Sequence, residues 1–254
     1  MSPWFRIRRP RPAAALSLFC FPYAGGAAAV FDSWSSRLTS DVEVVAMQPP
    51  GRAERIKDPP LVSMDSMVAE LLGAIGPYLT RPFVFFGHSN GALVGFELAR
   101  RMQLLGLGGL QHLIISGKRA PQLPPIVTLH AQPRRELIES LRAYGGVPEE
   151  ILQDDDFLDL YLPTLRADLA LGELHRFVPA PRLRSDATLF GGMADPLVPN
   201  ADLLAWASVL DGQISHHAFP GDHFFISSEA SRVLPTLDGV LNDIIHRRNQ
   251  TGAG

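Results

Sequence analysis

Apolar residues along the chain fall into two alternating patterns. Mostly apolar runs of roughly four to eight residues have the length of buried strands. They lie at 16–21, 42–47, 83–86 and 112–116. The segments 63–78 and 92–105 between these runs have apolar residues at the spacing of one helix face. Strands that alternate with helices predict parallel βαβ units, and therefore an α/β fold with a mostly parallel, doubly wound sheet.

The alternation stops in the segment 121–181. This segment has no strand pattern and two helical ones, at 133–144 and at 148–177, the second interrupted at Pro163. A strand-free segment inside a βα series predicts a helical insertion over one edge of the sheet, which we interpret as a lid. We therefore expect residues 1–254 to form one α/β domain in which 121–181 is a helical lid insertion.

The strand pattern resumes after this insertion. Two strands and two helices are expected there in alternation, at 186–190, 200–210, 213–219 and 227–246. A further short helix is expected near the start of the chain, at 31–38. These elements continue the βα series on both sides of the insertion.

The run at 83–86 leads directly into Gly87-His88-Ser89-Asn90-Gly91 and then into a helical pattern. A Gly-x-Ser-x-Gly sequence between a strand and a helix is typical of a nucleophile elbow, a sharp turn that holds the serine in a strained conformation. The two glycines leave room for close approach of the backbone. The alternative is a structural turn without a catalytic role. The strand and helix on either side favour catalysis, with Ser89 as the nucleophile.

Two further residues occupy the positions that such a site needs. Asp195 lies in a turn just beyond the strand expected at 186–190, where its carboxylate can orient an imidazole. His223 lies in a Gly-containing loop beyond the strand expected at 213–219 and is the candidate general base. The order Ser89, Asp195, His223 along the chain is that of an α/β-hydrolase.

Other acidic and histidine residues fit these roles less well. The alternative acids are Asp186, Asp202 and Asp222, and the alternative histidines are His88, His216 and His217. Asp186 opens its strand, and Asp202 lies inside a helix. Two of the histidines lie within a strand pattern, and His88 is too near Ser89 along the chain to act as its base. The spacing of His217, Asp222 and His223 matches no metal-ligand pattern.

The loop at 22–27 follows the first strand and is rich in glycine and alanine. In an elbow hydrolase, such a loop supplies one N–H of the oxyanion hole. We expect the two donors to be the backbone N–H groups of Ala24 and Asn90. The basic, then apolar, then small-residue order of the first 29 residues also resembles an export signal. Cleavage there would remove one donor, so we favour the strand interpretation.

Composition narrows the classes of function. The chain has 254 residues with 46% hydrophobic content, and its net charge of −3 argues against a nucleic-acid partner or a polybasic membrane anchor. No apolar run approaches the length of a membrane span. The single cysteine, Cys20, excludes an internal disulfide and fits a reducing cytoplasm. No metal or cofactor is expected, because the glycine cluster 106–109 follows a helix and the acidic cluster 154–156 fits a helix start.

Several longer stretches form a more specific pattern than the elbow alone. They are Trp4-Phe5, residues 18–26, Gln48-Pro49-Pro50-Gly51-Arg52, Gly87-His88-Ser89, residues 162–168 and residues 221–225. Together they resemble the stand-alone type II thioesterases of polyketide synthase and nonribosomal peptide synthetase pathways, over nearly the whole chain. The resemblance implies a small lid over an acyl chamber, and hydrolysis of acyl groups from the phosphopantetheine thiol of a carrier protein. Members of this family remove stalled or wrong acyl groups, which is an editing role.

Two positions depart from the family pattern. Asn90 stands where family members commonly have Met or Leu. Its backbone N–H can still serve the oxyanion hole, but we expect its polar side chain to alter the acyl preference of the chamber. Pro49 stands where the family motif has Leu, a change that we expect to be structural.

Three other functions remain open: a small-molecule carboxylesterase or lipase, a product-releasing thioesterase, and a non-catalytic module that binds carrier proteins. Releasing domains are usually fused behind a carrier protein, for which this chain has no room. An intact set of Ser89, Asp195 and His223 argues against the binding module. The expected partner is an acyl or peptidyl carrier protein, and the expected state is a cytoplasmic monomer.

Overall fold

The computed structural model describes residues 2–251, and within that range seven strands form one sheet. Their order across the sheet is β1-β3-β2-β4-β5-β6-β7. Every neighbouring pair is parallel except β1 with β3. The strands are β1 (Phe5–Arg6), β2 (Leu16–Phe21), β3 (Val42–Met47), β4 (Phe83–His88), β5 (Leu110–Ser116), β6 (Ala187–Gly192) and β7 (Ile214–Phe219). The predicted mostly parallel, doubly wound sheet is confirmed; the two-residue β1 lacks a pattern that could have predicted it.

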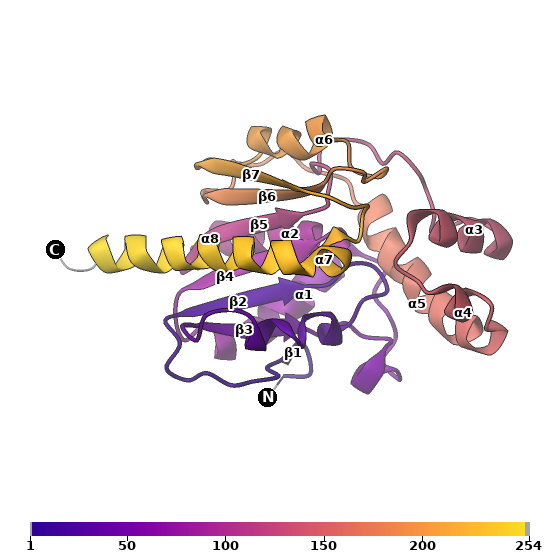
Figure 1. Cartoon of the computed structure of the whole chain (residues 1–254), viewed down its shortest axis with the longest axis horizontal. Coiled ribbons are helices and arrows are strands. Elements are labelled where there is room, and N and C mark those ends of the chain that lie inside the picture. The colour runs from indigo at the N-terminus through magenta and orange to yellow at the C-terminus, as the bar shows by residue number, and fades with distance from the viewer. Residues whose placement is uncertain (1, 252–254) are drawn as a thin grey trace.

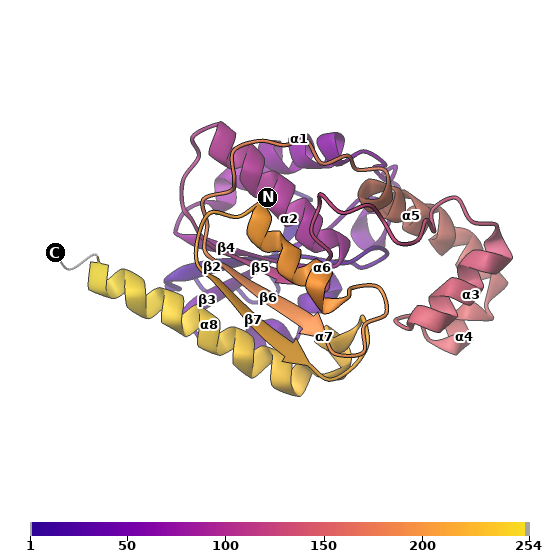
Figure 2. The same cartoon turned by 90° about the horizontal axis from the view of Figure 1, so that it is seen from above.

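Helices cover both faces of the sheet (Figures 1 and 2). One face carries α1 (Met64–Ile75), α2 (Asn90–Leu104) and α6 (Asn200–Leu204), and the other carries α7 (Phe225–Ser228) and α8 (Ala230–Thr251). Short 3₁₀ turns complete the connections: η1 (Ala28–Phe31), η2 (Trp34–Ser36), η3 (Ala53–Arg55), η4 (Gly76–Tyr78) and η5 (Ala205–Ser208). No helix within residues 2–251 is long and apolar enough to cross a membrane.

The central strands are buried on both faces, which is why their sequences are nearly unbroken apolar runs. On β4, Phe83 and Phe85 pack into the core under α1 and α2, whereas Val84 and Phe86 pack into the core under α8. Cys20 on β2 belongs to the second core and is fully buried. Burial raises the pKa of its thiol well above the usual value, so Cys20 is an inert core residue.

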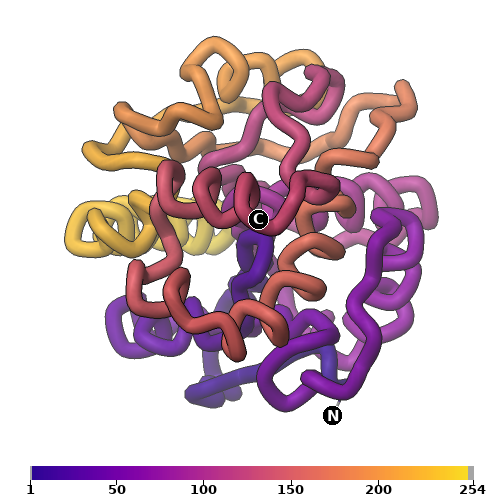
Figure 3. Tube along the Cα trace, turned by 90° about the vertical axis from the view of Figure 1, so that its right-hand side faces the viewer, coloured from indigo at the N-terminus to yellow at the C-terminus, as the bar shows by residue number. Residues whose placement is uncertain are grey.

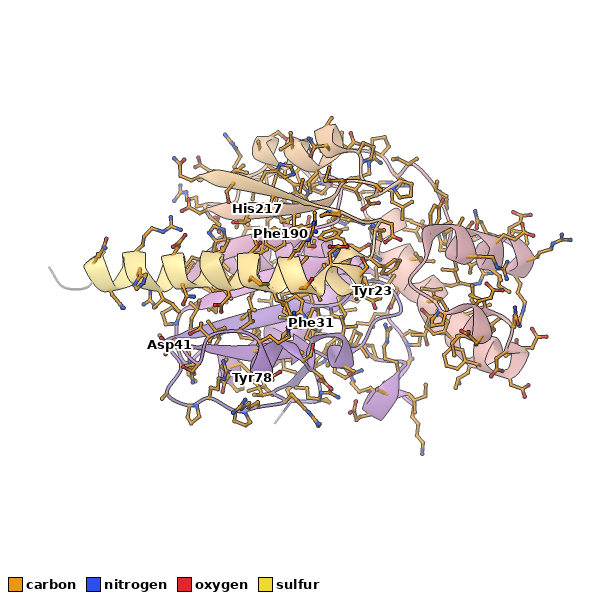
Figure 4. The ribbon with its side chains drawn as sticks, in the orientation of Figure 1. Tyr23, Phe31, Asp41, Tyr78, Phe190 and His217 are labelled. Atoms are coloured by element: carbon orange, nitrogen blue, oxygen red, sulfur yellow. The ribbon has the colours of Figure 1, made fainter. Side chains whose placement is uncertain are left out.

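Residues 121–181 contain three helices: α3 (Arg134–Tyr144), α4 (Glu149–Leu152) and α5 (Asp155–Glu173). They lie beyond the carboxyl ends of the strands (Figures 1 and 3). Figure 4 labels Tyr23 near this end of the sheet and Asp41 at the opposite end. The helices have their own apolar core, made of Leu129, Leu137, Leu141, Leu152, Leu158, Leu162 and Leu165.

The sequence placed the break in this helical segment at the wrong residue. Pro163 lies inside α5, and the chain breaks instead between α4 and α5. Asp154 sets the start of α5, because its side chain accepts a hydrogen bond from the backbone N–H of Phe157 at 2.9 Å. The acidic cluster is therefore a helix start, as predicted.

Three other segments that were each predicted as one helix are divided into shorter elements in the structure. The helix expected at 31–38 is replaced by η1 and η2, where Phe31 and Trp34 are buried with ring centroids 4.9 Å apart. Packing of these two rings against the sheet decides the local structure over the weak helical pattern. The helix expected at 200–210 is α6 followed by η5, and the last helix is divided at Glu229 into α7 and α8.

Candidate active site

Ser89 lies at the junction of β4 and α2 with φ 54° and ψ −123°, a strained backbone for a residue with a side chain. The flanking glycines are required by space. A Cβ on Gly87 would lie 2.4 Å from the backbone N of Ala92, and a Cβ on Gly91 would lie 2.0 Å from the carbonyl oxygen of Phe21. The close approach of β2, β4 and α2 thus holds Ser89 at the top of the sheet.

The structure brings the three sequence-predicted residues into one hydrogen-bonded chain. Ser89 Oγ lies 2.9 Å from His223 Nε2, and His223 Nδ1 lies 2.8 Å from Asp195 Oδ2. Asp195 is in the turn after β6, and His223 is in the loop after β7. Asp195 Oδ1 accepts a hydrogen bond from the backbone N–H of Leu197 at 2.8 Å, and the side chain of Asp195 has no exposed surface. This arrangement fixes the imidazole so that Nε2 faces the serine.

The alternative acids make other contacts. Asp186 accepts the N–H of Gln213, Asp202 pairs with Arg119, and Asp222 accepts the N–H of Phe224 in its own loop. Of the alternative histidines, His216 and His217 lie on β7. Within residues 2–251, no three His, Cys, Asp or Glu side chains gather as a metal site would require.

His88 lies behind the imidazole of His223, with the ring centroids 5.2 Å apart. Its Nδ1 is 2.9 Å from Ser116 Oγ, and the side chain is fully buried. Burial, and then the neighbouring His223, lower the pKa of His88 well below its ordinary value, so His88 is neutral. It supports the ring of His223 by packing, a role that no spacing in the sequence indicates.

The two expected oxyanion donors lie at the ends of neighbouring elements. Ala24 is in the loop after β2, and Asn90 is the first residue of α2. Among the described residues, neither backbone N–H donates a hydrogen bond to a protein acceptor. Both donors remain available to a ligand.

Asp168 on α5 ties the helical segment to the loop that carries Ala24. Its Oδ2 accepts the backbone N–H of Gly25 at 2.7 Å, and its carboxylate is paired with both terminal nitrogens of Arg52. Arg52 Nη1 also donates to the carbonyl of Gly26 at 3.0 Å. Two of the motifs behind the family resemblance, 48–52 and 162–168, are therefore in direct contact. The sequence shows the motifs but contains no signal that they meet.

A cavity of about 160 Å³ opens beside Ser89 and His223. Its wall is largely apolar, with Leu93, Val127, Leu129, Leu169 and Val198 among the lining residues. Ionisable side chains also line it: Lys118, Arg119, Glu173, His175 and His223.

The side chain of Asn90 is held in this wall from both ends. Asn90 Nδ2 donates to the carbonyl of Asp168 at 2.5 Å, and Asn90 Oδ1 accepts from Lys118 Nζ at 2.9 Å. Burial lowers the pKa of Lys118 to about 8, an effect that Glu173 opposes and Arg119 reinforces. The polar residue that departs from the family pattern is thus part of a buried hydrogen-bond network.

Comparison with known proteins gives a consistent result. A family model described as a thioesterase domain matches residues 17–243. The gramicidin S biosynthesis protein GrsT of Aneurinibacillus migulanus is 37% identical over 227 residues, which are 89% of this chain and 89% of GrsT. The solved structure of the type II thioesterase BorB from the borrelidin biosynthetic cluster is 32% identical, with a TM-score of 0.85 over 95% of this chain and 97% of BorB. The RedJ thioesterase from the prodiginine pathway of Streptomyces coelicolor is 34% identical, with a TM-score of 0.86 over 91% of this chain and 92% of RedJ.

Proposed function

The chain belongs to the thioesterase family, and on this premise we propose that it hydrolyses acyl thioesters on the phosphopantetheine arm of acyl or peptidyl carrier proteins. It removes aberrant or stalled acyl groups in polyketide or nonribosomal peptide synthesis, the editing role of type II thioesterases. The observation that carries the proposal is the hydrogen-bonded chain from Ser89 through His223 to Asp195.

The first half of the reaction acylates the enzyme. His223 Nε2 takes the proton of Ser89 Oγ as that oxygen attacks the thioester carbonyl. Asp195 holds the imidazole in the required tautomer and stabilises its cation. The C–S bond then breaks, and His223 returns the proton to the departing thiolate. In the second half, His223 activates a water molecule, which releases the acid and regenerates Ser89.

The negative charge that develops on the carbonyl oxygen is stabilised by the N–H groups of Ala24 and Asn90. Their lack of other acceptors supports this assignment. Removal of one donor from such a site typically costs about 10²- to 10³-fold in rate. A thiolate leaves more readily than an alkoxide, so this machinery favours thioesters over oxygen esters of the same acid.

The cavity beside Ser89 is the proposed acyl chamber, and residues 121–181 are its lid. Its volume of about 160 Å³ is close to the ~150 Å³ that holds a benzene molecule. The chamber therefore suits short acyl groups of about six heavy atoms. The protein is proposed to act in the cytoplasm as a monomer, without metal or cofactor, since the phosphopantetheine arm belongs to the substrate.

Intact-protein mass spectrometry of acyl carrier proteins tests the proposal. Short-chain acyl carrier proteins are incubated with the wild type and with Ser89→Ala, beside a p-nitrophenyl ester. Loss of the acyl mass with the wild type alone supports the thioesterase. Efficient cleavage of the ester with untouched carrier proteins would identify a small-molecule esterase instead. Failure of a fluorophosphonate probe to label Ser89 would identify a non-catalytic binding module.

A further inference from the structure

The proposed acyl chamber contains an ammonium group fixed beside the nucleophile. Lys118 follows β5, and the backbone around it is anchored: Gly117 N–H donates to Phe190 O at 2.9 Å, and Trp206 Nε1 donates to Lys118 O at 2.7 Å. Lys118 Nζ then donates to the side chain of Asn90, the residue after Ser89. The cation is therefore held against the side chain that follows the nucleophile, in the wall of the same cavity.

Within the described residues this cation forms no ion pair, although the charge of the nearby Glu173 raises its pKa. Within residues 2–251, no carboxylate oxygen lies within 4.0 Å of Lys118 Nζ. Glu173, the acidic residue in the same wall, has its oxygens occupied by the N–H groups of Leu129 and His130 and by His130 Nδ1. The neighbouring cation, Arg119, is already paired with Asp202 at 2.7 Å.

Two of the three N–H donors of Lys118 have no protein acceptor among the described residues. Lys118 is partly buried, and partial burial of a cation without these acceptors is unfavourable; burial lowers its pKa to about 8. A carboxylate of the substrate would supply both the missing acceptors and the missing charge, because charge-assisted hydrogen bonds are the strongest available. Most of the remaining wall is apolar, and the other cationic or titratable side chains in it already have protein partners. Arg119 is paired with Asp202, His175 contacts Glu97, and His223 contacts Ser89 and Asp195.

Resting on the proposed function, we propose that the chamber selects short acyl groups whose far end carries a carboxylate. These are the monothioesters of short dicarboxylic acids, of which malonate is the smallest suitable example. Lys118 is the residue that determines this specificity. In the reaction, Ser89 breaks the C–S bond and releases the thiol, and water then releases the free dicarboxylic acid. The distal carboxylate is unchanged.

The phosphate of the phosphopantetheine arm is a second anion that a lysine can bind. It is separated from the thioester by the whole pantetheine chain, whereas Lys118 contacts the residue next to Ser89. The position of the cation therefore favours the acyl carboxylate.

The test compares malonyl with 3-methylbutanoyl, which has the same heavy-atom skeleton but no charge. Both are presented as N-acetylcysteamine thioesters, which lack the phosphate, and on a carrier protein. We expect the wild type to hydrolyse malonyl with a kcat/KM about tenfold or more above that of 3-methylbutanoyl, the magnitude of one hydrogen bond to a charged group. Lys118→Met should lose this preference, and Lys118→Arg should retain it. Lys57→Met removes the same charge from an exposed surface position and should leave the preference intact.

The outcomes separate the two proposals. Hydrolysis of 3-methylbutanoyl with no malonyl preference in the wild type would overturn the specificity and leave the thioesterase standing. An equal malonyl preference in the wild type and Lys118→Met would overturn the role of Lys118. Loss of activity in Lys118→Met on both carrier-bound substrates, but on neither N-acetylcysteamine thioester, would assign the cation to the phosphate. No thioester hydrolysis at all by the wild type would overturn the proposed function itself.

Discussion

Asp168 on α5 accepts a hydrogen bond from the backbone N–H of Gly25, 2.7 Å away and 143 positions distant in the sequence. Gly25 adjoins Ala24, one of the two proposed oxyanion donors. The same carboxylate is paired with Arg52, which also holds the carbonyl of Gly26. A helix of the proposed lid therefore fixes the loop that carries one of these donors. Through this carboxylate, binding of an acyl group under the proposed lid would be linked to stabilisation of the oxyanion.

Removal of this link should lower activity. In Asp168→Leu, Gly25 loses its acceptor and the loop that carries Ala24 can shift. Because a displacement of about 1 Å in an active site can cost about 10²-fold in rate, we expect a loss of that order in kcat. Steady-state kinetics on an acyl carrier protein measure it. An unchanged kcat in a folded Asp168→Leu protein would contradict the positioning role.

The Arg52–Asp168 pair should also affect stability. Both side chains are about nine-tenths buried. Arg52→Met leaves an unpaired buried carboxylate and should lower the free energy of unfolding by about 3–5 kcal/mol. The double variant Arg52→Met/Asp168→Leu removes the buried charges together, so it should recover much of the stability while kcat stays low. Thermal and urea unfolding beside kinetics distinguish the two effects. Equal stability of the single and double variants would rule out this electrostatic explanation.

Ser89→Ala should abolish turnover while the fold remains intact. Loss of the nucleophile from a Ser-His-Asp site typically costs about 10⁶-fold in kcat. The side chain forms no contact in the apolar cores, so the melting temperature should change little. Circular dichroism melts beside single-turnover assays provide the measurement. Activity of Ser89→Ala at the level of the wild type would assign catalysis to another residue.

Asp195→Asn should be nearly as damaging, although the substitution preserves shape. The amide cannot stabilise the imidazolium of His223 and favours the wrong tautomer, so kcat should fall about 10⁴-fold. The other acid in the neighbourhood, Asp222, is a matched control, because its Oδ1 caps the N–H of Phe224 rather than contacting His223. Asp222→Asn should keep most of the activity. A greater loss of activity in Asp222→Asn than in Asp195→Asn would identify Asp222 as the acid that orients His223.

The preference for a carboxylate should depend on pH. Burial lowers the pKa of Lys118 to about 8, Glu173 raises it and Arg119 lowers it; His175 and His223 line the same cavity. Lys118 is charged below that pH, so the malonyl preference should be complete near pH 7 and should fall as the pH rises through 8. The ratio of kcat/KM values for malonyl and 3-methylbutanoyl cancels the titration of His223, which acts on both. A ratio constant from pH 7 to pH 9.5 would contradict the prediction.

Local patterns in the sequence were enough to predict the six parallel strands β2–β7 and to single out Ser89, Asp195 and His223, which the structure brings into one hydrogen-bonded chain. Buried parallel strands need apolar runs, and Ser89 and Asp195 each follow one of them, whereas His223 follows the largely unburied edge strand β7. The contacts of Asp168 with Gly25 and of Lys118 with Asn90 each join a helix to a loop that is distant in the sequence, and no periodicity encodes them. Phe31 and Trp34 show the converse, because tertiary packing overrides a weak helical pattern there. Pro163 does not break α5, whereas Asp154 marks the start of that helix.

The helices over the site bury most of their leucines against one another rather than in either core of the sheet. A substitution in this leucine cluster that reshapes the proposed chamber should therefore leave both cores of the sheet intact. Asp168 is the exception on these helices, because it holds Gly25 and Asn90. Such an architecture gives protein engineers a set of leucine positions to vary, with Asp168 retained, when a different acyl group is to be removed.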